Sequence, residues 1–141
     1  MIRWLALFGL LFAAPACADC PSLSHLTIEG QTITLTARTP PAALDRDNPA
    51  ALHLHFAQMH LGFPLPPFLS ISLEPNGPDG DWTITTLRLE RASPAAPMVF
   101  APDSLRLSGS PADTVFTIEG DAMVPGAVLI PIHIETHLSS P

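Results

Sequence analysis

The chain has 141 residues, of which 47% are hydrophobic, and its formal net charge is −7 at pH 7. Only 6 residues are Lys or Arg, so the clustered positive charge that nucleic-acid binding needs is missing. The length suits one domain with a modest hydrophobic core.

The N-terminus has the pattern of a secretory signal peptide. Arg3 precedes an apolar run over residues 4–14, and small residues follow at the expected cleavage position before Asp19. We therefore predict a signal peptide over 1–18 and a single mature domain over 19–141, located in the periplasm or secreted. The apolar run is shorter than the roughly 20 residues that cross a bilayer. No later stretch approaches that length, so no membrane span is expected in the mature chain.

Two cysteines leave an alternative at this end of the chain. Cys17 follows small residues, as in a lipidation box, but the leucine usually found three positions earlier is absent. Cys17 and Cys20 also form a C-x-x-C motif, which suggests redox or metal chemistry. Cleavage before Asp19 would remove Cys17, and the single cysteine that remains excludes an internal disulfide.

Short alternating segments separated by Pro, Gly, Asn and Asp predict β-strands along the mature chain. These segments cover residues 26–37, 68–73, 82–90, 98–100, 104–108, 114–119 and 127–138. Residues 62–67 are rich in proline and are predicted to be a connection, and residues 75–81 a hairpin loop. Pro131, inside the last segment, predicts an edge strand or a bulge.

Together with the histidine-rich segment described next, these patterns predict an all-β fold, an antiparallel immunoglobulin-like β-sandwich of about seven strands. Its inward-facing residues follow from the period-two alternation. The predicted core consists of Ile28, Ile33, Leu35, Leu54, Phe56, Ile71, Trp82, Ile84, Leu105, Phe116, Ile118, Ile132 and Ile134.

The segment over residues 52–60 holds three of the six histidines. As a strand it places Leu52, Leu54 and Phe56 on one face and the histidines at 53 and 55 on the other. A helix is the alternative, since Asn48 could be an N-cap, Pro49 could be the first helical residue and Gly62 could end the helix. We favour the strand, because the helix would be apolar nearly all round.

Histidine and methionine on exposed strand faces indicate a metal site. His53, His55 and Met59 share one predicted face, and His133 and His137 share another with Glu135 between them. Neutral imidazole binds copper, zinc and nickel, and a thioether favours Cu(I). We predict that these five residues are the ligands of a metal site and that the chain is an exported copper carrier or chaperone. Zinc is the second choice of metal.

The alternative is a metal-free periplasmic β-sandwich module that binds a partner protein. In that case the methionines fill gaps in the core and the histidines form the polar face of amphipathic strands. Enzymatic activity is not expected, because no nucleophile elbow, phosphate-binding loop or H-E-x-x-H motif occurs. A zinc-dependent activity that uses Glu135 stays a third hypothesis.

Overall fold

The computed structural model describes residues 21–38, 51–77, 81–124 and 128–139. The predicted signal peptide, Cys17 and Cys20 thus lie outside the described residues. The strands are β1 (Leu23–Ile28), β2 (Gln31–Ala37), β3 (Leu52–His60), β4 (Phe63–Asn76), β5 (Asp81–Glu90), β6 (Met98–Val99), β7 (Arg106–Ser110), β8 (Val115–Val124) and β9 (Val128–His137), and two 3-10 turns are η1 (Pro102–Ser104) and η2 (Pro111–Asp113). Among these elements there is no helix long and apolar enough to cross a membrane.

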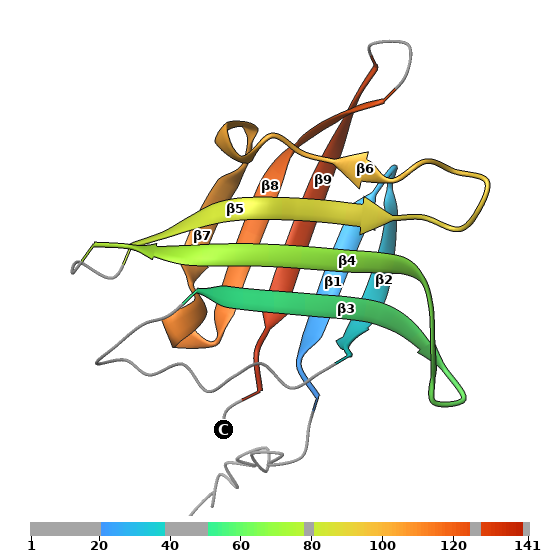
Figure 1. Cartoon of the computed structure of the whole chain (residues 1–141), viewed down its shortest axis with the longest axis horizontal. Helices are drawn as coiled ribbons and strands as arrows, with labels where there is room; N and C mark the ends of the chain where they lie inside the picture. Colours follow the sequence, from blue (N-terminus) through green and yellow to red (C-terminus); the bar gives the residue numbers. More distant parts are fainter. Residues whose placement is uncertain (1–20, 39–50, 78–80, 125–127, 140–141) are drawn as a thin grey trace, which may run out of the picture.

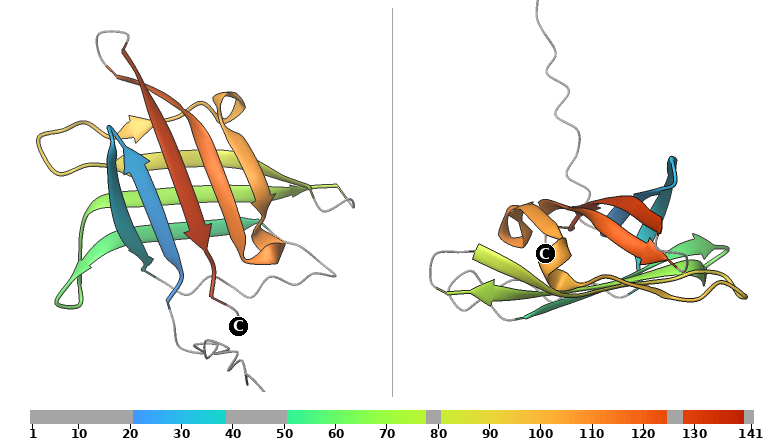
Figure 2. Two further views of the ribbon diagram at one scale, coloured as in Figure 1. Left: turned by 180° about the vertical axis from the view of Figure 1, so that it is seen from behind. Right: turned by 90° about the horizontal axis from the view of Figure 1, so that it is seen from above.

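The strands form one antiparallel sheet in the order β6-β5-β4-β3-β2-β1-β9-β8-β7, which confirms the predicted all-β antiparallel class. The sheet folds over so that β3 to β6 cross in front of β1, β2 and β7 to β9, and the two halves face one another (Figures 1 and 2). We call these halves the front layer and the back layer.

The layers are joined where β2 pairs with β3, in the register pairs Thr36 with Ala57 and Ala37 with Phe56. The backbone N–H of Arg38 extends this link by donating to the carbonyl of His55 at 2.8 Å. An immunoglobulin-like fold has two separate sheets, whereas here the β2–β3 pairing keeps both layers in one sheet. The described strands therefore differ from the predicted immunoglobulin-like topology at this corner.

The hydrophobic core fills the space between the two layers. Every residue predicted for it is buried or packs against it, and Met98 is buried there too. The segment over 52–60 is a strand, as predicted, with Leu52, Leu54 and Phe56 buried and His53 and His55 exposed. Full burial of a Leu, Ile or Phe side chain contributes about 1.5–3 kcal/mol, so this alternation fixes which face of each strand points inward.

Two predictions about prolines are wrong in part. Of the predicted connection over residues 62–67, residues 63–67 belong to β4, which pairs with β3 on both sides of a register shift after Ala57. Pro66 and Pro67 fall in that shift, where their missing N–H groups cost no ladder hydrogen bond. Pro131 lies in β9, an interior strand, but the β1–β9 pairing ends at Ile132, so Pro131 lies beyond the end of β1.

One polar pair interrupts the apolar core. Ser24 of β1 and Thr136 of β9 are register partners and are both buried. Their hydroxyl oxygens lie 3.2 Å apart, within hydrogen-bond distance. Each hydroxyl thus satisfies the other in a place that water does not reach.

We expect Gly109→Ala to destabilise the protein through a close backbone approach. Gly109 of β7 has φ +81°, and a Cβ there would lie 2.8 Å from the Val115 carbonyl oxygen. The left-handed backbone alone costs an alanine about 1–2 kcal/mol, and the contact adds to that cost. The control is Gly30→Ala, where φ is +76° and no atom lies within 4 Å of the added Cβ. Urea denaturation measures both, and equal losses would contradict the role of the close approach.

Candidate functional site

Two predicted ligands, His53 and His55, lie side by side on the outer surface of the front layer. Each stands opposite a serine of β4 in register, His53 opposite Ser72 and His55 opposite Ser70. The Nδ1 atoms lie 2.9 Å and 3.1 Å from the two serine hydroxyl oxygens. Both histidines therefore have a local partner that orients the ring and does not depend on a metal.

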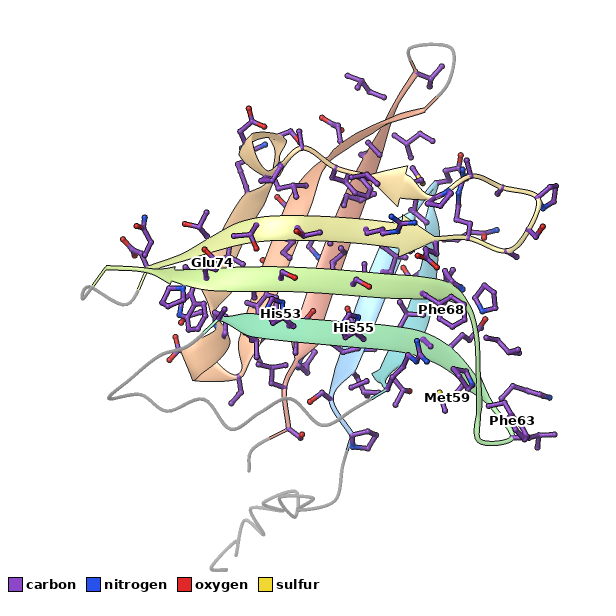
Figure 3. The ribbon with its side chains drawn as sticks, viewed as in Figure 1. His53, His55, Met59, Phe63, Phe68 and Glu74 are labelled. Atoms are coloured by element: carbon purple, nitrogen blue, oxygen red, sulfur yellow. The ribbon has the colours of Figure 1, made fainter. Side chains whose placement is uncertain are left out.

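Met59 does not join that pair. Figure 3 shows His53 and His55 along the middle of β3, whereas Met59 lies toward the end of the hairpin, near Phe63. The register shift after Ala57 separates the two regions. The thioether that favoured Cu(I) is thus not beside the imidazoles with which it was predicted to act.

The other two predicted ligands, His133 and His137, lie on the outer surface of the back layer. Their neighbours in β9, Ile132, Ile134 and Thr136, are buried, so the histidines face away from the core. Since Leu54 and Ile134 both point into the space between the layers, the histidines of β3 and β9 emerge on opposite sides of the molecule. The predicted single site of five ligands is therefore not formed, because metal–nitrogen bonds of about 2 Å cannot span two layers that pack roughly 10 Å apart.

The back layer has a further histidine that is not among the predicted ligands. His25 of β1 is the register partner of Glu135, which separates His133 from His137 in β9. The His25 and His137 ring centres are 5.8 Å apart, edge to face. The sequence contained a sign of this outward position, because His25 lies between Ser24 and Leu26, and in a strand the residues on either side of an outward-facing residue point inward.

Two carboxylates hold histidines on this surface. The Nε2–H of His137 donates to Glu135 Oε1 at 2.5 Å, and the Nδ1–H of His133 donates to Glu119 Oε1 at 3.0 Å. The hydrogen bond from His137 lowers the pKa of Glu135 below its ordinary value. Positive charge on His137, His25 and His133 acts in the same direction, while desolvation opposes it. The surface therefore favours an ionised Glu135 next to imidazole.

Within the described ranges, no three His, Cys, Asp or Glu side chains converge closely enough to hold a metal ion together. A hollow of about 380 Å³ lies on the same layer, and its charged lining is Glu29, Arg106, Glu119, Asp121 and His133. Because carboxylates outnumber the single arginine in this lining, the hollow suits a cation better than an anion.

The tip of the β3–β4 hairpin is the feature that the sequence reading missed. Met59, Leu61, Phe63 and Leu65 are 42%, 85%, 71% and 44% exposed there. We call these four residues the hairpin tip. The pairs Gln58 with Leu65, Met59 with Pro64 and His60 with Phe63 keep it ordered as a two-stranded ribbon. A signal was available, since residues 48–73 contain no Asp, Glu, Lys or Arg.

Comparisons with protein-family models, with curated proteins and with solved structures find no match for this chain.

Proposed function

We propose that this chain is an exported, non-catalytic β domain that binds a partner protein through its hairpin tip. The observation that carries the proposal is an ordered hairpin tip on which all four large apolar side chains are exposed. The register places Phe63 and Leu65 on one face of the ribbon and Met59 on the other, with Leu61 in the turn between them. Contiguous exposed apolar surface on a soluble domain generally marks an interaction site. Side chains of this kind serve as anchors that fill a pocket on the partner.

The backbone of the turn supports this proposal. Leu61 has φ +49° and Gly62 has φ +82°, which are the signs required at the two central positions of a type I′ hairpin turn. Asn or Asp is favoured at the first position, and a bulky residue with positive φ is an outlier. Leu61 thus keeps a bulky apolar side chain in solvent at a position where a polar residue is favoured.

Charge favours a protein partner over a lipid surface. Amphipathic segments that bind membranes have Lys or Arg beside their apolar residues, whereas residues 48–73 have neither. The chain's net charge of −7 also opposes approach to anionic lipid. We therefore expect the hairpin tip to enter an uncharged, apolar pocket on a protein of the same compartment.

Leu61→Asn is expected to separate binding from stability. Asparagine tolerates the left-handed region, whose cost to other residues is roughly 1–2 kcal/mol, so the variant should gain up to about that much stability while losing its apolar anchor. The matched control is Glu29→Asn, because Glu29 and Gly30 have the same turn signs, φ +51° and +76°, at the β1–β2 turn. That control should gain similar stability and keep its binding.

The partner is identified and tested in two steps. A photo-crosslinking amino acid at position 61 is compared, in the producing cell, with one at the exposed apolar residue Leu129. A protein captured from position 61 alone is then purified and titrated against wild type, Leu61→Asn and Glu29→Asn. A loss of affinity of tenfold or more in Leu61→Asn alone supports the proposal. Equal affinity of all three proteins, or sedimentation with lipid vesicles that depends on Leu61, overturns it.

Copper transport through one set of ligands from both strands has no support in this arrangement of His53, His55, Met59, His133 and His137. Metal binding on the back layer is a separate matter, which does not depend on the hairpin tip.

A further inference from the structure

We infer that His25 and His137 form a surface site for a divalent copper or zinc ion on the back layer. The site is distinct from the hairpin tip and from the front-layer histidines. Its ligands come from neighbouring strands, since β1 and β9 are paired from Leu23 with His137 to Ile28 with Ile132. The pairing places the two imidazoles on adjacent strands of one rigid surface.

The ring separation suits two imidazoles on one ion. With metal–nitrogen bonds of about 2 Å, the two ring centres lie roughly 4.5 Å apart when the nitrogens are at a right angle around the metal, and roughly 6 Å apart when they are opposite each other. The observed separation is 5.8 Å. A site with two protein ligands, completed by water, also agrees with the finding that no three ligating side chains converge among the described residues.

Each of the two rings has one nitrogen held by a protein group. His25 Nδ1 lies 3.0 Å from the Thr34 hydroxyl, and His137 Nε2–H donates to the Glu135 carboxylate. The other nitrogen of each ring has no partner among the described residues. A carboxylate or hydroxyl behind a ligating imidazole fixes its tautomer and makes it a better donor. Glu135 is thus a positioning residue that holds the His137 lone pair on Nδ1.

The donor set decides the metal. A site made of imidazole and water ligands, with a carboxylate hydrogen-bonded to one imidazole, binds Cu²⁺ more tightly than Zn²⁺. The thioether that would favour Cu(I) is on the hairpin instead, at Met59. We therefore expect Cu²⁺ to bind first and Zn²⁺ to compete at higher concentration.

The experiment is a titration of the purified chain with copper sulfate and, separately, zinc chloride, followed by calorimetry and by the nitrogen couplings in the Cu²⁺ paramagnetic resonance spectrum. All proteins carry Cys20→Ser, so that thiol binding does not contribute. His25→Gln and His137→Gln should each weaken Cu²⁺ binding tenfold or more and remove one nitrogen from the spectrum. Glu135→Gln should weaken it by about tenfold with both nitrogens retained, as expected for a group behind the ligand.

The matched control is the front-layer pair, which has the same residue type and hydroxyl partners, whereas a ring contact is found only between His25 and His137 among the described histidines. His53→Gln and His55→Gln should leave Cu²⁺ affinity unchanged. Equal losses in all four histidine variants, or no loss in His25→Gln and His137→Gln, would overturn the site and mean an adventitious ion only. Circular dichroism of each variant verifies the fold, so that a misfolded protein is not counted as a lost ligand.

Discussion

Replacing Phe56 by alanine is expected to lower the free energy of unfolding by about 3–5 kcal/mol. Phe56 is among the largest fully buried side chains, and it lies where β3 pairs with β2 at the corner between the layers. Its removal loses the transfer free energy of the ring and leaves a cavity that a corner held by two strands cannot close. Total stabilities of about 5–15 kcal/mol would leave this variant marginally folded. Urea denaturation followed by circular dichroism measures the loss.

The neighbouring residue provides the control for this experiment. His55 is next to Phe56 in β3 but points outward, so His55→Ala should change stability by less than about 0.5 kcal/mol. Comparable losses of stability at the two positions would mean that one face of β3 is not buried in the core while the other faces solvent. That result would contradict the observed layers.

Thr136→Val should cost about 1–3 kcal/mol, although the two side chains have nearly the same shape. The substitution removes the hydroxyl that lies 3.2 Å from the buried Ser24 hydroxyl. Ser24 then keeps a polar group in the core with no partner, and the desolvation penalty is no longer offset. Thermal and urea unfolding of the variant measure this penalty.

The double variant Ser24→Ala, Thr136→Val distinguishes an unpaired hydroxyl from a packing defect. Removing both polar groups can be nearly neutral, so the double variant should recover much of the stability lost in Thr136→Val. If the stability loss in the double variant equals the sum of the losses in Ser24→Ala and Thr136→Val, the two hydroxyls do not depend on each other.

Alternation predicted the strands and the core well, because burial of one face is a local property of each segment. Leu54, Phe56 and Ile134 were placed correctly for this reason. Alternation does not say which layer a strand joins, so it could not show that His55 and His133 emerge on opposite sides. The strand order depends on long-range pairing, such as β1 between β2 and β9.

The proposed binding surfaces were harder to predict because their residues do not follow the usual patterns. Leu61 occupies a turn position where a polar residue is expected, and the prolines of β4 were interpreted as a connection. His25 was not among the predicted ligands, and no other histidine lies near it in the sequence. Its neighbour His137 is 112 positions away and becomes adjacent only through the β1–β9 pairing.

That pairing also determines when the fold can form during synthesis. The first strand of the described chain, β1, lies in the sheet against the last strand, β9. Until β9 has been synthesised, β1 has a free edge on one side and β8 has a free edge on the other. The back layer, whose inward surface packs against the front layer, is complete only when β9 is in place. We therefore expect the nascent chain to stay without a stable core until β9 has been synthesised, because contacts between distant segments close slowly.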